Sequence, residues 1–203
     1  MGRGKLVLIT GGARSGKSGF AEEMAMSLSG DVTYIATAEA LDEEMKDRIR
    51  HHRERRPQHW QTVEEPRRVA EAIAEVGQTA PVILLDCLTL LCCNLLLEKG
   101  RFEGEQFFIA PEEESRILAY LKEMAGVARE VPAHVIIVAN EIGLGLVPPY
   151  ELGRAYRDLA GWANQAVAEA ADEVYFTIAG LPIEIRELGM QTRRRFQTGK
   201  DGL

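Results

Sequence analysis

The chain has 203 residues, 46% of them hydrophobic and 27% charged, with a formal net charge of -7. This length suits one soluble domain with a single core, and the acidic balance argues against a general nucleic-acid-binding protein, whose partner is itself a polyanion. We expect a cytoplasmic protein without membrane insertion, because the three cysteines form no disulfide pattern, no leader peptide is recognisable and no apolar run approaches the roughly 20 residues that span a bilayer.

Short apolar runs typical of buried strands alternate with helical patterns along most of the chain. Strands are expected at residues 6–10, 32–36, 82–85, 135–138 and 174–178, with a short sixth at 183–185. Helices are expected at 17–29, 41–56, 66–76, 88–98, 111–129 and 151–171, and loops at 100–109 and 141–150. This alternation is typical of βαβ units, so we predict an α/β fold with a mostly parallel central sheet and helices on both faces.

A change in composition near residue 187 divides the chain into two parts. Residues 1–186 carry the alternating pattern and are predicted to form a single domain. Residues 187–203 are polar and include the run Arg193-Arg194-Arg195, so this tail is a candidate for disorder.

A glycine-rich segment follows the first strand and precedes the first helix. It runs Gly11-Gly12-Ala13-Arg14-Ser15-Gly16-Lys17-Ser18 and matches the pattern G-x-x-x-x-G-K-[ST]. Glycines allow a tight turn whose N–H groups surround phosphates, and the positive end of the helix dipole adds to this attraction. Lys17 is expected to reach the β- and γ-phosphates, and the Ser18 hydroxyl to bind Mg²⁺. The alternative is a chance glycine turn, but the strand before it and the helix after it favour a P-loop that binds ATP or GTP.

Asp86 ends the strand at 82–85. A P-loop protein needs an acidic residue at the end of a neighbouring strand to position the metal, and Asp86 suits that role. The alternative is that Asp86 caps the helix that follows, with Thr89 nearby. Both roles stay open on the sequence alone.

Three of the four histidines lie among arginines between residues 48 and 60. One interpretation is a solvated helix face with i,i+4 pairs such as Asp47 with His51. The other is catalysis, because a neutral imidazole is a good nucleophile towards phosphorus and arginines bind phosphate oxygens bidentately. A zinc site is disfavoured, since adjacent histidines on a helix point in different directions and no cysteine is near.

Several segments, taken together, resemble a known family. They are residues 10–18 and 34–38, Arg48-Ile49-Arg50-His51-His52, Arg56-Pro57, Trp60, Asp86-Cys87-Leu88-Thr89, Asn94-Leu95, Asn140-Glu141-Ile142-Gly143, Val147-Pro148 and several positions in the segment 160–174. The family is that of the bifunctional adenosylcobinamide kinase / adenosylcobinamide-phosphate guanylyltransferases of cobalamin biosynthesis. The Ala13-Arg14-Ser15 version of the P-loop, joined to the His-His helix, is far more specific than a P-loop alone.

The resemblance implies a concrete activity. Such an enzyme phosphorylates the aminopropanol hydroxyl of adenosylcobinamide with ATP or GTP, and Mg²⁺ accompanies the nucleotide. It then transfers GMP from GTP, through a guanylylated histidine, to adenosylcobinamide phosphate, which yields adenosylcobinamide-GDP and pyrophosphate. By position, His51 resembles the guanylylated histidine, and His52 a neighbour that orients or packs against it. The resemblance also implies a RecA-like P-loop fold and a homotrimer whose site lies near a subunit interface.

The resemblance further implies nucleotide contacts outside the P-loop, at Ala36, Thr37 and Ala38, at Arg53, Glu54, Arg55 and Arg56, and at Glu64 and Asp86. Glu64 has an alternative role at the N-terminus of the next helix, and Glu141 is either functional or a solvated loop acid. Family members are expected to end near Ile185, so residues 188–203 are assigned no role. Two other functions stay open: a plain small-molecule kinase whose His helix is a lid, and a regulatory ATPase that moves a partner protein.

Overall fold

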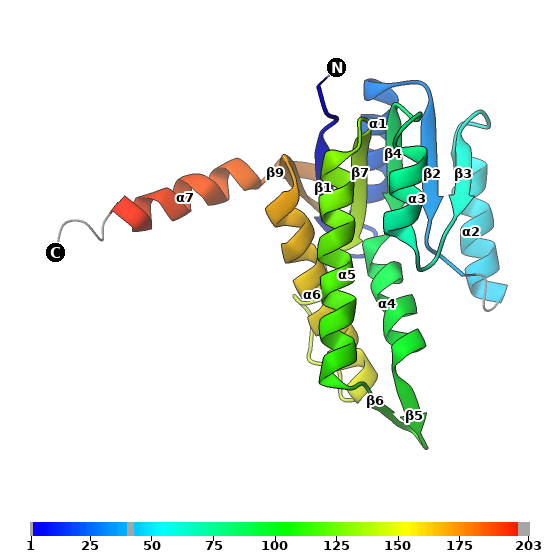
Figure 1. The fold of residues 1–203 in the computed structure, drawn as a ribbon, viewed down its shortest axis with the longest axis vertical. Coiled ribbons are helices and arrows are strands. Elements are labelled where there is room, and N and C mark those ends of the chain that lie inside the picture. The colour runs from blue at the N-terminus through cyan, green and yellow to red at the C-terminus, as the bar shows by residue number, and fades with distance from the viewer. Residues whose placement is uncertain (1, 40–42, 199–203) are drawn as a thin grey trace.

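The computed structural model describes residues 2–39 and 43–198. A seven-stranded sheet in the order β3-β2-β4-β7-β1-β8-β9 forms its centre (Figure 1). The strands are β1 (Leu6–Gly11), β2 (Val32–Ala36), β3 (Gln61–Glu64), β4 (Val82–Asp86), β7 (His134–Asn140), β8 (Glu173–Ile178) and β9 (Leu181–Glu184). Neighbouring strands pair in parallel except β8 and β9, which confirms the predicted α/β class with a mostly parallel sheet.

Helices cover both faces of the sheet. They are α1 (Lys17–Leu28), α2 (Glu43–Arg55), α3 (Val69–Val76), α4 (Leu88–Lys99), α5 (Pro111–Glu130), α6 (Glu151–Ala170) and α7 (Arg186–Thr198). Successive strand residues face opposite sides, and in β1 both sides are buried: Leu6 and Leu8 pack with α3 to α6, whereas Val7 and Ile9 pack with α1. Across the described residues, no helix combines the length and apolarity needed to cross a bilayer.

Several elements differ from the prediction. β3 was not expected, because three of its four residues are polar and it pairs with β2 at the edge of the sheet. Residues 100–109, expected as a loop, form a hairpin of β5 (Arg101–Glu103) and β6 (Gln106–Phe108), in which the rings of Phe102 and Phe107 lie 5.3 Å apart. α3 begins three residues after the expected start at residue 66, and the expected start of α2 at residue 41 lies outside the described residues.

The polar tail begins with a helix, α7, which projects away from the body of the protein (Figure 1). Glu184 caps its start, because Oε1 accepts a hydrogen bond of 2.9 Å from the N–H of Arg186 and Oε2 one of 3.0 Å from the N–H of Glu187. The Arg186 guanidinium also donates to the carbonyl of Ala168 at 2.9 Å. These capping contacts favour a helix where composition alone suggested disorder.

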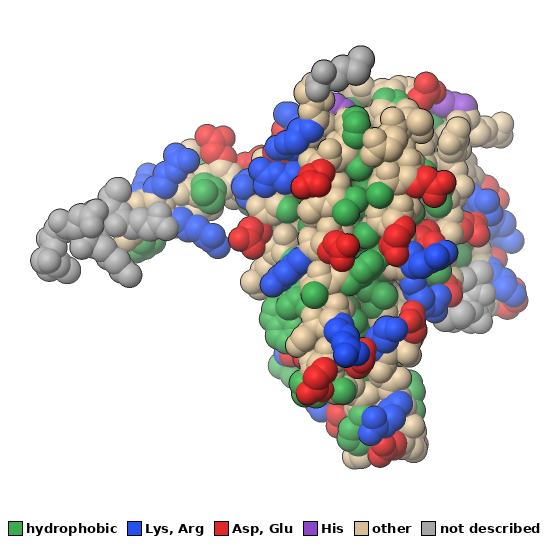
Figure 2. Space-filling view, in the orientation of Figure 1, with side chains coloured by type: hydrophobic (Ala, Val, Ile, Leu, Met, Phe, Trp, Pro, Cys, Tyr) green, Lys and Arg blue, Asp and Glu red, His purple; other side chains and the backbone are tan. Residues whose placement is uncertain are grey.

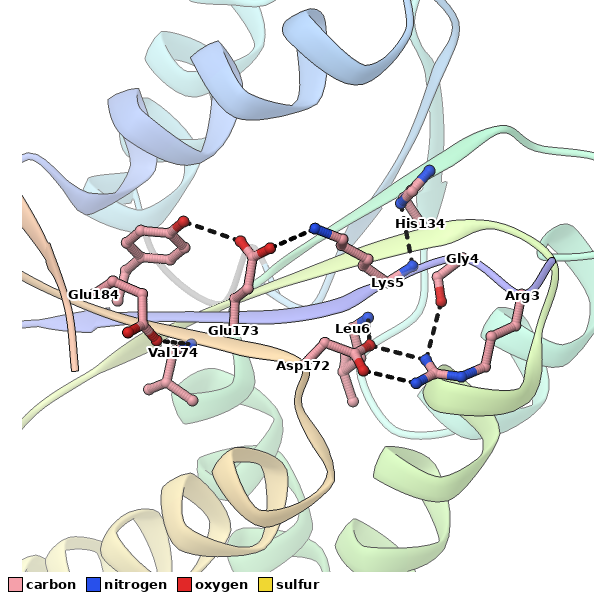
Figure 3. A network of polar contacts seen from close by, with 10 residues as sticks. Arg3, Gly4, Lys5, Leu6, His134, Asp172, Glu173, Val174 and Glu184 are labelled. Atoms are coloured by element: carbon pink, nitrogen blue, oxygen red, sulfur yellow. Dashed lines mark hydrogen bonds and ion pairs between the residues drawn. The ribbon is translucent and has the colours of Figure 1, made fainter. Parts of the chain in front are cut away.

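Charged side chains form a paired network at the amino ends of β1 and β8 (Figure 3). Arg3 donates two hydrogen bonds to Asp172, of 2.6 and 2.8 Å, and the N–H of Leu6 donates a third of 2.9 Å. Lys5 lies 2.6 Å from Glu173. The Arg3 hydrogen bond is the main reason that the pKa of Asp172 falls to about 2, and Lys5 likewise lowers the pKa of Glu173.

Candidate active site

The carboxyl ends of the parallel strands lie together at one end of the sheet, where ligands bind in folds of this class. Glu64, Ala36 and Asp86 are aligned there at paired positions of β3, β2 and β4. On the far side of β4, Gly11 at the end of β1 pairs with Asn140 at the end of β7. The P-loop and several of the residues expected to accompany it therefore lie at this end of the sheet.

The P-loop connects β1 to α1 and packs against the turn between β8 and β9. Gly16 adopts a left-handed conformation, with φ 98°, just before α1 begins at Lys17. The carbonyl of Ser15 accepts a hydrogen bond of 2.9 Å from the N–H of Gly180. A Cβ on Gly16 would lie 3.1 Å from the Cα of Gly180, so both its dihedral angles and its packing favour glycine. The first N–H groups of α1 have no partners within the helix, which suits this turn to phosphate binding.

Lys17 is buried beside the loop, and its Nζ donates a hydrogen bond of 3.0 Å to the carbonyl of Gly12. Burial lowers the pKa of Lys17, while the charge of Asp86 acts in the opposite direction. An ammonium group whose charge is penalised by desolvation is stabilised by an anionic partner. The position of Lys17 therefore suits a phosphate partner. Ala13 and Arg14 are exposed at the tip of the same loop.

Asp86 ends β4, but β4 is not the neighbour of β1. β7 lies between the two strands, so the expectation of an adjacent strand is wrong, because strand order leaves no mark in the local sequence. The N-cap of α4 is Cys87, which gives no support to a capping role for Asp86. The half-buried carboxylate of Asp86 and the half-buried hydroxyl of Ser18 are the oxygen ligands that Mg²⁺ prefers, and these two residues fit the metal carried by a bound nucleotide.

Thr37, in the turn after β2, is fully buried. Its hydroxyl hydrogen-bonds the backbone N–H and carbonyl of Cys87, each at 2.8 Å, and its own carbonyl accepts a bond of 2.8 Å from the Asn94 side chain. The Thr37 side chain therefore ties the end of β2 to the end of β4. Ala36 and Ala38 on either side are partly exposed and remain open to a ligand.

A second set of polar contacts, centred on Thr89, joins the ends of β4 and β7. The Thr89 hydroxyl accepts hydrogen bonds from the backbone N–H of Asn140 at 2.8 Å and from its side-chain amide at 3.2 Å. Asn164 on α6 donates to the carbonyl of Asn140 at 3.2 Å. The sequence analysis did not predict Thr89 or Asn140 as site residues. For Thr89, the presence of a polar residue in the otherwise apolar sequence of α4 could have indicated such a role.

His51 lies on α2 with its side chain 69% exposed, and its Nδ1 is 3.6 Å from Oε2 of Glu54. Asp47, the partner considered from the sequence, pairs with Arg50 at 2.9 Å instead. Basic and acidic side chains are intermixed over this edge of the molecule (Figure 2). The 3.6 Å separation between His51 and Glu54 is longer than a hydrogen bond, so Glu54 is an exposed neighbour of the imidazole rather than a fixed partner.

Glu64, at the end of β3, is exposed and lies 3.6 Å from Nη1 of Arg53 on α2. The neighbouring Glu65 accepts the backbone N–H groups of Arg67 and Arg68, at 3.0 and 2.8 Å, just before α3. The helix-terminal role considered for Glu64 thus belongs to Glu65. Glu64 instead links β3 to the histidine helix.

Arg56 follows α2 and is buried, with its guanidinium carbon 3.3 Å from the centre of the Tyr34 ring. Its Nε and Nη1, and Nε1 of Trp60, have no hydrogen-bond partner among the described residues. The surrounding cavity has a volume of about 380 Å³ and is lined by Arg53, Arg56, Pro57, Gln58, Trp60 and Thr62. Buried donors without partners mark this cluster as a candidate ligand site, and a ligand would reach these covered nitrogens after the side chains shift.

The structure does not bring His51 to the P-loop. The P-loop follows β1, whereas α2 lies beside β3 at the sheet edge, with β7, β4 and β2 between β1 and β3 (Figure 1). The side chains of His52 and Arg55 lie outside the described part of α2. The candidate residues therefore form two groups, one around the P-loop and one around α2 and its cavity.

Known proteins are similar to this chain over most of its length. A family model described as "Cobinamide kinase / cobinamide phosphate guanyltransferase" matches residues 7–185. The chain is 46% identical over 181 residues to the "Bifunctional adenosylcobalamin biosynthesis protein CobP" of Pseudomonas aeruginosa, covering 88% of this chain and 96% of that protein. It is 40% identical over 181 residues to the corresponding CobU protein of Escherichia coli, covering 89% and 99%.

Solved structures with a more distant likeness include a recombinase. The RadB recombinase has a TM-score of 0.44 and 15% identity, covering 86% of this chain and 74% of its own. A second solved structure, of an ATPase domain, has a TM-score of 0.43 and 17% identity, covering 85% and 68%.

Proposed function

The chain belongs to the cobinamide kinase / cobinamide phosphate guanyltransferase family of adenosylcobalamin biosynthesis, and we propose that it carries out two successive transfers on a cobinamide substrate. In the first, ATP or GTP phosphorylates the aminopropanol hydroxyl of adenosylcobinamide. In the second, GMP passes from GTP to adenosylcobinamide phosphate, giving adenosylcobinamide-GDP and pyrophosphate. The observation that carries this proposal is the presence, on one chain, of a P-loop with a buried lysine and an exposed histidine beside a carboxylate.

The P-loop group performs the first transfer. The substrate hydroxyl oxygen bonds to the γ-phosphorus and releases its proton to solvent, the bond from that phosphorus to the bridging oxygen breaks, and the nucleoside diphosphate leaves. Lys17 neutralises the charge that develops on the β- and γ-phosphate oxygens. Ser18 and Asp86 would hold the Mg²⁺ that accompanies a nucleotide, and such an ion would supply further charge neutralisation.

The α2 group performs the second transfer. Nε2 of His51 bonds to the α-phosphorus of GTP as the bond to pyrophosphate breaks, and the product is a phosphoramidate on the histidine. The neighbouring carboxylate of Glu54 stabilises the positive charge that the imidazole gains in this step. A phosphate oxygen of adenosylcobinamide phosphate then attacks the same phosphorus, the P–N bond breaks, and His51 is regenerated.

Residues around the α2 cavity bind the guanine nucleotide in this second step. Arg56 has two buried donor nitrogens without partners among the described residues, and Arg53 lines the same cavity. Ala36 and Ala38 are partly exposed at the strand end beside them, and Glu64 lies opposite Arg53. Guanidinium groups bind phosphate and base acceptors well, which suits them to a nucleotide.

A movement of α2 would bring the two groups of residues together. α2 is strongly polar and lies at the edge of the sheet, tied to β3 by the Arg53–Glu64 pair. We therefore place the guanylyl transfer in a form of the enzyme in which α2 has moved towards the nucleotide. By family resemblance we also propose a cytoplasmic homotrimer, whose oligomeric state sedimentation of the pure protein tests directly.

Labelling with GTP that carries a radioactive α-phosphate tests the proposed intermediate. We expect an acid-labile, base-stable phosphoramidate on the wild-type protein and no label on His51→Ala, which keeps at least part of its kinase activity. His59→Ala is the matched control, because His59 lies in the same segment and bonds to the carbonyl of Gly30 at 2.9 Å. Label that survives in His51→Ala contradicts the mechanism. Full turnover without label indicates a plain kinase, and hydrolysis without any acceptor indicates a regulatory ATPase.

A mixing experiment tests whether α2 acts within its own chain. Lys17→Ala and His51→Ala proteins are each expected to label poorly, the first because its pyrophosphate leaving group is less well stabilised. When the two are dissociated and reassembled together, labelling stays low if the P-loop and His51 of one chain cooperate. Recovery of labelling in the mixture would show that a neighbouring copy supplies the nucleotide, and would remove the need for α2 to move.

A further inference from the structure

The loop between β7 and α6 exposes an unusual concentration of large apolar side chains. Leu144 is 80% exposed, Leu146 96%, Val147 64% and Tyr150 60%. Isolated exposed apolar residues are common on soluble proteins, but several within seven residues form a patch that is typical of a binding surface. The kinase and guanylyltransferase chemistry described above uses none of these side chains.

Internal hydrogen bonds restrain the two ends of this loop. The N–H of Gly143 donates to Oε1 of Glu141 at 2.7 Å near the start of the loop. Near its end, Nη1 of Arg154 on α6 donates to the carbonyls of Pro148 and Pro149, at 3.1 and 2.7 Å. The prolines further restrict the backbone. A loop that is ordered in advance presents its apolar side chains to a ligand at a low entropic cost.

The loop begins at the P-loop itself. Asn140, the last residue of β7, pairs with Gly11, and the N–H of Glu141 donates to the carbonyl of Gly11 at 2.9 Å. From there the loop continues to the first turns of α6 (Figure 1). The start of the loop therefore lies beside the P-loop, and most of its exposed apolar side chains follow four to seven residues later along the chain.

We propose that Leu144, Leu146 and Val147 bind the corrin macrocycle of the phosphate acceptor. This inference rests on the proposed function, because it takes the acceptor to be a cobinamide. A corrin is a broad ring system with an apolar conjugated core and methyl groups, amide side chains project from its rim, and the reacting hydroxyl lies at the end of a short aminopropanol arm. Because the hydroxyl must reach the P-loop while the macrocycle is too large to enter it, the macrocycle lies on the adjoining surface, and the β7–α6 loop supplies apolar contacts there.

The double variant Leu144→Ser/Leu146→Ser tests this surface in the full-length protein. Both side chains are exposed in the free protein, so folding is expected to be preserved. We expect the KM and the Kd for cobinamide, the latter from equilibrium dialysis, to rise about tenfold or more. The Kd for ATP and the labelling of His51 by GTP are expected to stay within about twofold of wild type.

Two controls separate corrin binding from other effects. Phe196→Ser removes a side chain that is 76% exposed on α7 and is expected to leave every constant unchanged. A truncated acceptor, N-acetyl-1-amino-2-propanol, carries the reacting hydroxyl without the macrocycle. We expect wild type and the double variant to phosphorylate it at the same low rate, because the lost contacts are made only with the corrin.

The outcomes distinguish this inference from the proposed function. Unchanged cobinamide Kd in the double variant overturns the inference, whatever the labelling experiment shows. A variant that dissociates from its oligomer, with cobinamide affinity unchanged per folded subunit, assigns the loop to a contact between copies and also overturns it. Absence of label on His51 in the wild type contradicts the guanylyl-histidine mechanism, yet leaves the dialysis test of the loop intact.

Discussion

Charged groups at the amino ends of the parallel strands differ in their pairing from those of the candidate site. At the amino ends, Arg3 and Lys5 are bonded to the carboxylates of Asp172 and Glu173 at 2.8 Å or less. At the candidate site, Lys17 bonds to a carbonyl of its own loop, and Arg56, which follows α2 and lies over the Tyr34 ring of β2, has two nitrogens without a partner among the described residues. Paired charges stabilise the fold, whereas buried donors without partners reduce stability and are typical of sites where a ligand completes the pairing.

The largest expected effect is on Lys17→Ala. Loss of its charge beside the β- and γ-phosphates should reduce phosphorylation of cobinamide by about 100-fold or more. The free energy of unfolding should stay level or rise, since a desolvated ammonium is removed from a buried position. Steady-state kinetics and urea unfolding measure the two effects.

Lys5→Ala is the matched control for Lys17→Ala at the opposite end of the strands. It should retain full kinase activity and lose some stability, because it removes a partner of Glu173. Kinase activity near the wild-type level in Lys17→Ala would contradict the contrast between the paired groups at the amino ends and the groups of the candidate site.

Arg56→Met should have an intermediate effect. Methionine keeps an unbranched apolar chain over the Tyr34 ring but removes the donor nitrogens. We expect the KM for GTP in the guanylylation of His51 to rise about tenfold, with phosphorylation from ATP little changed. A ligand role for Arg56 would be contradicted if the variant bound GTP as well as the wild type but was strongly destabilised.

Asp172→Asn should have the smallest effect, and only on stability. We expect a loss of about 1 kcal/mol in the free energy of unfolding at pH 7, since the hydrogen bonds from Arg3 and Leu6 then reach a neutral, partly exposed group. In the wild type this contribution is present above the unfolded-state pKa of about 3.9 and is lost as the pH falls through the native pKa of about 2. Urea unfolding between pH 7 and pH 2.5 should show a weaker acid dependence in the variant, whereas identical curves would contradict the role of the pair.

Local sequence predicted the parts of the site better than their arrangement. The P-loop and Lys17 follow from contiguous residues with a strand before them and a helix after them. The insertion of β7 between β1 and β4 was missed, because parallel strands distant in the chain choose neighbours through packing that no local pattern encodes. Thr37 shows the same limit: its hydroxyl turns inward to Cys87 only because β2 and β4 pair.

The elements that were missed owe their form to specific contacts rather than to composition. β3 is polar and becomes a strand by pairing with β2, and α7 begins where Glu184 caps two N–H groups. Glu65 rather than Glu64 serves the start of α3, a difference of one residue that depends on the direction of a side chain. Residue types alone do not distinguish such cases.

The close contact between Gly16 and Gly180 couples the phosphate-binding loop to a turn that is distant in the chain. Gly180, with φ 80°, favours glycine through its backbone, and a Cβ on Gly16 would lie only 3.1 Å from the Cα of Gly180. A side chain at Gly16 should therefore push the turn between β8 and β9 away from the P-loop. Through this contact and the Ser15–Gly180 hydrogen bond, a turn at the margin of the sheet helps to set the position of the phosphate-binding loop.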